Sequence, residues 1–122
     1  MIGLPSLAQF DRTTSTRIWL CLAPTDMRRG FDGLAEQVRS VTRQDPQSGH
    51  LFLFRSRGGD RLKALWWDKD GYALWHKRLE EGTFKLPKAA AESCSVELRA
   101  SKLTMILDGV KRVKRYRRET SV

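Results

Sequence analysis

The residues of this chain best suited to chemistry are the cations near its C-terminal end. Six of the eight residues from Lys111 to Arg118 are lysine or arginine. Such a run predicts binding to the phosphates of DNA or RNA, with an aromatic ring available to stack on a base. The predicted contacts in this run are Lys111, Arg112, Lys114, Arg115, Tyr116, Arg117 and Arg118. The alternative is a solvated, disordered tail over residues 111–122 that only aids solubility.

A second group of cations surrounds the segment Ser56-Arg57-Gly58-Gly59-Asp60. Because two apolar runs flank this segment, the sequence predicts a strand hairpin with arginines at its tip. Two-stranded ribbons can enter a major groove, where arginine forks suit guanine edges and phosphates. The predicted contacts are Arg55, Arg57, Arg61 and Lys63, with Lys77 and Arg78 on a neighbouring strand. The alternative is that Asp60, Asp68 and Asp70 neutralise the arginines in surface ion pairs of little energetic consequence.

A third candidate is the motif Asp26-Met27-Arg28-Arg29-Gly30, at the expected start of a helix. Arginines oppose the dipole at a helix start, so Arg28 and Arg29 are mildly unfavourable there unless an anion binds too. The motif therefore predicts a phosphate contact. The alternative is that Asp26 pairs with a nearby arginine.

Enzymatic chemistry is poorly supported by the sequence. A metal-dependent nuclease would need clustered carboxylates, and those available are Asp60, Asp68, Asp70, Glu80 and Glu81. Asp68, Asp70 and Glu80 fall on expected turns, where acidic residues are ordinary. His76 has no adjacent Ser or Cys nucleophile in the sequence. We therefore predict no catalytic residue.

The two cysteines, Cys21 and Cys94, are far apart in the sequence and form no CxxC pair. With only two histidines to complete a ligand set, a zinc site is improbable and two reduced thiols are expected. We predict neither a metal nor a cofactor.

Length and charge set the outer limits. A chain of 122 residues fits one domain. The formal net charge is +9, and the last twelve residues carry about half of it. An excess of this size favours DNA, RNA or an acidic protein as the partner. Neither a signal peptide nor a spanning segment is recognisable, so we expect a cytoplasmic protein without a membrane partner.

The first half of the chain has to position these groups. Residues 1–16 predict a loosely ordered leader, and Arg17–Leu22 predicts a buried strand. The spacing of apolar residues predicts an amphipathic helix from Met27 to about Arg43. Its predicted core face is Phe31, Leu34, Ala35, Val38 and Val41. Gly30 and Gly33 lower helix stability, so they mark either a close approach of another backbone or the true start of the helix.

The middle of the chain predicts three strands, His50–Arg55, Arg61–Trp67 and Tyr72–Leu79, joined by short loops that contain glycine. This pattern is typical of an antiparallel meander. Trp66 and Trp67 should lie on opposite faces of it. The meander offers more apolar surface than it can hide alone, so the helix from Met27 should cover it.

Towards the C-terminus, Phe84–Pro87 should be extended and Lys88–Ser95 a loop or short helix. Val96–Arg99 predicts a small edge strand, and a last helix should begin at Ser101 and stop at Gly109. The fold class predicted is α+β: an antiparallel β-meander packed against amphipathic helices in a single domain, residues 17–110, followed by the basic C-terminal tail.

Several motifs of the chain resemble one known family. They are IGLP at Ile2, PTDMRRGFDGLA from Pro24, DPQSGHLFLFRSRGGDRLKALWWDKDGY from Asp45, KRLEEGTFKLP from Lys77 and LTMILDGV from Leu103. In this order they resemble the TnpB-type accessory proteins of the insertion-sequence-sixty-six transposable-element family. These are distinct from the RNA-guided nucleases that share the name. Residues 7–16, which look like an insertion, and the loop from Lys88 to Val96 depart from the family pattern.

The resemblance implies a bacterial protein that serves DNA transposition beside a separate transposase, and it brings no active site with it. We therefore expect a non-catalytic accessory factor that binds element DNA at the transposon ends, the transposase, or both. The alternatives are a metal-dependent nuclease and a protein whose basic surface binds only an acidic face of the transposase. The sequence separates neither DNA from RNA nor one oligomeric state from another.

Overall fold

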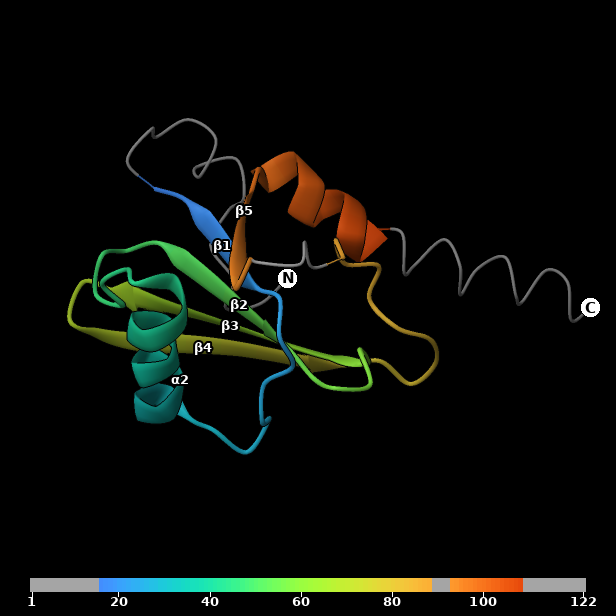
Figure 1. The fold of residues 1–122 in the computed structure, drawn as a ribbon, viewed down its shortest axis with the longest axis horizontal. Coiled ribbons are helices and arrows are strands. Elements are labelled where there is room, and N and C mark those ends of the chain that lie inside the picture. The colour runs from blue at the N-terminus through green and yellow to red at the C-terminus, as the bar shows by residue number, and fades with distance from the viewer. Residues whose placement is uncertain (1–15, 89–92, 109–122) are drawn as a thin grey trace, which may run out of the picture.

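The structure, a computed structural model, describes residues 16–88 and 93–108. Within them the chain forms one mixed β-sheet with helices on both of its faces (Figure 1). The strands are β1 (Ile18–Cys21), β2 (Leu51–Arg55), β3 (Arg61–Asp68), β4 (Gly71–Arg78) and β5 (Ser95–Leu98). Their order across the sheet is β4-β3-β2-β1-β5. The predicted α+β class is therefore confirmed, and each predicted strand is present to within about two residues.

The predicted antiparallel meander forms only part of a larger, mixed sheet. Strands β2, β3 and β4 form the expected meander, but β1 runs parallel to β2, with Trp19 opposite Phe52. On its other side β1 pairs with β5 in the antiparallel sense. The parallel pair follows from the helical connection between β1 and β2, because a crossover returns the chain to the starting end of the sheet.

The first helix is shorter than predicted. It is α2 (Phe31–Gln37), which continues as the π-helical turn η1 (Val38–Thr42). Gly30 occupies the N-cap with an extended backbone, so the glycine marks the true start of the helix and Met27–Arg29 lie in the preceding loop. Phe31, predicted to be in the core, is 48% exposed because it stands in the first helical turn, beyond the sheet face. The helical run ends at Arg43, where φ is 57°.

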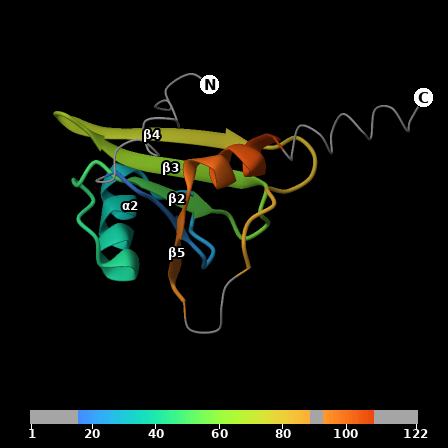
Figure 2. The ribbon, with the colours of Figure 1, turned by 90° about the horizontal axis from the view of Figure 1, so that it is seen from above.

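Side chains alternate between two hydrophobic cores among the described residues. On one face, Leu34, Ala35 and Val38 of the helix pack with Phe52 and Phe54. On the other face, Leu51 and Leu53 pack with the C-terminal helix, which spans residues 100–108. Its buried residues are Ala100, Leu103, Ile106 and Leu107. The two helices thus flank opposite sides of the sheet (Figures 1 and 2), and β2 is buried on both faces.

The paired tryptophans lie on opposite faces of the sheet, as predicted. Trp66 is 7% exposed and belongs to the core under the C-terminal helix. Trp67 lies on the other face, where its ring stands edge-on to that of Tyr72 with centroids 5.0 Å apart. Trp67, which alternation along the strand places on the second face, is therefore only partly exposed.

Candidate nucleic-acid interface

The β2–β3 turn carries the first of the predicted cations. Arg57 is exposed within this turn. Asp60 does not neutralise it: the Ser56 hydroxyl donates to the Asp60 carboxylate at 3.1 Å and accepts from the Arg61 backbone N–H at 3.0 Å. Gly59 has a φ of 76°, a conformation that glycine adopts without strain. The acidic residue of the turn therefore shapes the turn and leaves the arginines available.

Arg55 and Lys63 have structural contacts that the sequence did not reveal. The Arg55 Nε–H donates to the Leu22 carbonyl at 2.9 Å, and the residue is half-buried. The Lys63 side chain is buried, and its ammonium group donates to the carbonyls of Met27 at 2.8 Å and Arg29 at 2.9 Å. Both cations thus hold loops against the sheet, and the Lys63 ammonium is turned away from any nucleic acid that approaches from solvent.

The loop before α2 contains the ion pair that the sequence offered as an alternative. Asp26 accepts hydrogen bonds from the Arg28 backbone N–H at 2.9 Å and from Arg28 Nη2 at 2.8 Å. These side-chain and backbone hydrogen bonds hold the pKa of the Asp26 carboxyl well below its usual range. The Arg28 side chain is nevertheless 90% exposed. Arg29 is also exposed, and its guanidinium makes a long contact of 3.5 Å to the Gln37 side-chain oxygen.

This loop and the β2–β3 turn meet in space. The Thr25 N–H donates to the Arg55 carbonyl at 2.8 Å, which joins the loop to the end of β2. Between them lies a recess of about 510 Å³ lined by residues 24–27, 56–58, 60 and 61. The structure therefore brings together two motifs that are about thirty residues apart in the sequence. The recess has mixed charge, because Arg57 and Arg61 share it with Asp26 and Asp60.

Positive charge also gathers where β3 begins and β4 ends. In the antiparallel register Arg61 is directly opposite Arg78, and Lys63 is opposite His76. Because residues two apart share a sheet face, all four lie on the α2 side. We call Arg61, Lys63, His76 and Arg78 the β3–β4 cationic cluster. Like charges directly opposite one another destabilise a strand pair.

The titration of His76 reflects this surrounding charge. Partial burial lowers the pKa of His76, and the nearby cations Lys63, Arg61 and Arg78 lower it further. Among residues 16–88 and 93–108 the ion pairs are Arg17–Glu97, Arg28–Asp26 and Arg39–Glu36, so none of them involves the cluster. The sequence had pointed to Arg78 only as a neighbour. The position of the turn after Asp68 sets the register of the hairpin, and this register would have predicted that Arg78 lies opposite Arg61.

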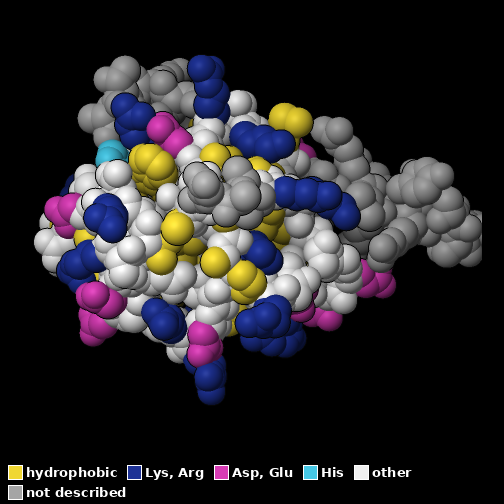
Figure 3. All heavy atoms as spheres, viewed as in Figure 1, with side chains coloured by type: hydrophobic (Ala, Val, Ile, Leu, Met, Phe, Trp, Pro, Cys, Tyr) yellow, Lys and Arg dark blue, Asp and Glu magenta, His cyan; other side chains and the backbone are white. Residues whose placement is uncertain are grey.

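The face seen in Figure 3 shows how the charge is spread. Lys and Arg side chains are distributed over it, with Asp and Glu side chains between them. The surface is therefore not one continuous basic patch. A polyanion on the face seen here would meet separate cations with acidic side chains between them.

A comparison with protein families identifies the chain. The family model described as IS66 Orf2 like protein matches residues 16–117. The chain belongs to this family. As an IS66 Orf2-like chain it is a transposon accessory protein, in agreement with the resemblance noted in its motifs.

Two curated relatives of this Orf2-like chain come from Sinorhizobium fredii. The uncharacterized protein y4hO is 38% identical over 96 residues, which cover 79% of this chain and 82% of the relative. The uncharacterized protein y4jC is 42% identical over 71 residues, 58% of this chain and 61% of that relative. No solved structure matches the chain.

The remaining predicted contacts of the Orf2-like chain are in the C-terminal run. Lys111, Arg112, Lys114, Arg115, Tyr116, Arg117 and Arg118 lie outside the described residues, as does the leader up to residue 15. Their role in binding stays a prediction from the sequence.

Groups with other chemistry in this Orf2-like chain can be placed directly. Within the described segments, the side chains of His, Cys, Asp and Glu nowhere gather in a set of three that could hold a metal ion. Cys21 and Cys94 are both free thiols, and burial is the main cause that raises the pKa of Cys21 to about 12. In the same segments, every helix falls short of the length and apolarity needed to cross a membrane.

Proposed function

We propose that this accessory protein is non-catalytic and binds the DNA of its element through the α2 side of the sheet. The contacts would be made to phosphates by Arg57 of the β2–β3 turn, by Arg28 and Arg29 of the preceding loop, and by Arg61 and Arg78 of the cationic cluster. Phosphate contacts of this kind fix position on the duplex and carry no sequence information by themselves.

The observation that carries this proposal is the pairing of Arg61 with Arg78. Two guanidinium groups directly opposite on neighbouring strands repel each other, and no carboxylate of the described residues forms an ion pair with either. A phosphate placed between them would relieve this repulsion and accept charge-assisted hydrogen bonds from both. The local strand pair is thus more favourable with an anion than without one.

The test compares two double variants that remove the same charge. Arg61→Ser with Arg78→Ser removes the proposed clamp, whereas Arg99→Ser with Lys102→Ser removes two exposed cations at the start of the C-terminal helix. Binding to duplex DNA is measured over a salt series. We expect the first pair to lower the log–log salt slope by about 0.9, for the one phosphate held between the two arginines, and the control pair to change it little. Equal slopes for the two variants would contradict the proposal.

A second candidate partner is an acidic face of the transposase. The mixed charge of the recess, where Asp26 and Asp60 lie beside Arg57 and Arg61, favours a partner that carries both signs. This candidate predicts that the Arg61/Arg78 variant loses the transposase in a pull-down with purified proteins while its binding to duplex DNA is unchanged.

A further inference from the structure

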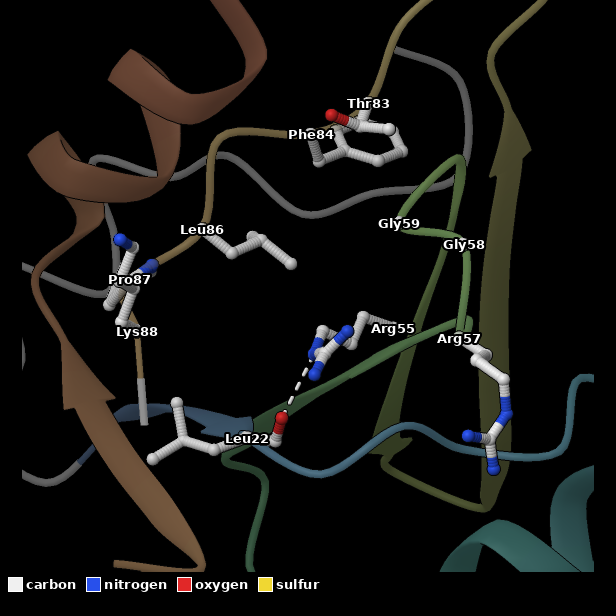
Figure 4. A pocket seen from close by; sticks show the side chains of 10 residues that line it. All are labelled: Leu22, Arg55, Arg57, Gly58, Gly59, Thr83, Phe84, Leu86, Pro87 and Lys88. Carbon is white, nitrogen blue, oxygen red and sulfur yellow. Dashed lines mark hydrogen bonds between the residues drawn. The ribbon is translucent and has the colours of Figure 1, made fainter. Parts of the chain in front are cut away.

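A second pocket lies beside the recess, across the β2–β3 turn. Its volume is about 320 Å³, and Arg57 and Gly58 line both it and the recess. Its other walls come from Leu22 after β1, Arg55 of β2 and the extended segment Thr83–Lys88 (Figure 4). Three segments far apart in the sequence therefore converge on one site.

The charge inside this pocket comes from Arg55. Its guanidinium lies in the middle of the pocket between Leu22 and Leu86, whereas Arg57 points away from it (Figure 4). Arg55 Nε donates to the Leu22 carbonyl at 2.9 Å and Nη1 to the Ser56 carbonyl at 3.4 Å. A guanidinium has five N–H donors. Two of those of Arg55 make these bonds, and the others have no acceptor among the described residues.

The rest of the lining adds a second cation and an apolar wall. Lys88 is exposed at the edge of the pocket, and none of the lining residues that the structure describes is Asp or Glu. Leu22 and Phe84 are each 5% exposed, and Leu86 is half-buried, so the wall is firmly packed. A ligand suited to this lining has an anionic group at one end and an apolar, flat or compact body at the other.

We propose that this pocket binds one unpaired nucleotide of a DNA strand, with a phosphate on Arg55 and Lys88 and the base against Leu22 and Leu86. The volume lies at the small end of the range for ligand pockets, so it accommodates a single nucleotide and excludes a duplex. The inference rests on the proposed DNA binding, because a strand lying along the recess passes over Arg57 and Gly58 into this pocket. The site would make the protein prefer unpaired or frayed strands.

The test uses a matched pair of charge reversals in one extended segment. Lys88→Glu changes a lining residue, and Lys85→Glu makes the same change in charge at an exposed residue outside the pocket. The probe is a tetramer of thymidylate, with binding followed by fluorescence anisotropy. We expect Lys88→Glu to weaken binding about tenfold, as for loss of one charge-assisted contact, and Lys85→Glu to weaken it less than about threefold. Equal losses would overturn the proposal.

Two further measurements identify the ligand in the wild-type protein. The amide resonances of Gly58, Gly59 and Thr83 should shift with the thymidylate tetramer and shift much less with an abasic tetramer, which has phosphates but no bases. Equal shifts with both would show that the pocket reads only charge and would overturn the inference. So would tighter binding of a capped Asp-Leu peptide than of the tetramer, because a protein ligand would then be preferred.

The outcome is separable from that of the proposed function. Lys88→Glu should leave the salt slope for duplex DNA unchanged, because the pocket does not admit paired strands. The Arg61/Arg78 variant should in turn keep the resonance shifts of Gly59 and Thr83 with the tetramer. If the duplex result fails while these shifts persist, the cationic cluster is excluded as the duplex site and the pocket stands alone.

Discussion

At the scale of single residues, the cationic side chains of this sheet have two different roles. Lys63 and Arg61 are two residues apart on one face of β3. Lys63 is buried and donates hydrogen bonds to two backbone carbonyls. Arg61 has no acidic partner among the described residues. A buried ammonium requires hydrogen bonds to offset its desolvation. The carbonyls of Met27 and Arg29 supply them, and in return the loop before α2 is held against the sheet.

Replacing Lys63 should therefore reduce stability. Lys63→Met keeps the length of the side chain but leaves the carbonyls of Met27 and Arg29 without their donor, so we expect a loss of about 1–3 kcal/mol in the free energy of unfolding. Urea denaturation followed by tryptophan fluorescence measures it. Lys77→Met is the matched control, because Lys77 is exposed on β4 and should change stability by less than about 0.5 kcal/mol. Similar values for both variants would contradict a structural role for Lys63.

At the scale of elements, alternation and turn chemistry are local and so predict the strands well. Strand pairing is not local: the parallel contact of β1 with β2 depends on residues about thirty positions apart, and nothing in either strand specifies the direction of its neighbour. Gly30 makes the helix begin later than the apolar spacing indicated. The candidate site, like the fold, was predictable only in its local features. Its arginines were recognised, but the burial of Lys63 depends on a loop that only the folded chain brings near.

The strand pair β3–β4 makes His76 a reporter of bound phosphate. Its pKa is lowered by partial burial and by Lys63, Arg61 and Arg78. A phosphate between the arginines would offset this positive field, so DNA should raise the pKa of His76, and DNA affinity should increase as the pH falls towards the unbound pKa. An NMR titration of the imidazole protons, with and without duplex DNA, measures the shift.

His50 provides the internal control for this titration. Burial also lowers its pKa, but its charged neighbours are Arg17 and Glu97, far from the cluster in the sheet. Its titration should not respond to DNA. If His76 titrates identically with and without DNA, phosphate does not bind at Arg61 and Arg78. For both histidines the folded pKa is the lower one, so protonation favours the unfolded chain, and stability should decline as the pH drops below about 6.5.

At the scale of the whole molecule, positive charge is divided between the described residues and the C-terminal run. The run from Lys111 to Arg118 holds six cations, whereas the face described above intersperses its cations with acidic residues. An unshielded run raises the rate of association and the non-specific affinity for any polyanion. Cations fixed by strand register can instead set the position of the DNA. We expect the two to contribute differently to binding.

A chain that ends at Gly109 separates these contributions. Because it lacks all six cations of the run, its affinity for duplex DNA should fall steeply at low salt, and its log–log salt slope should decrease by up to about 5. A full-length chain with the same six residues changed to serine, and Tyr116 kept, distinguishes charge from stacking: equal losses in the two chains would assign the effect to charge alone. The residual binding of the truncated chain should fall further with Arg61→Ser and Arg78→Ser. If truncation changes neither affinity nor slope, the run does not contact DNA, and the folded face must hold the phosphates without it.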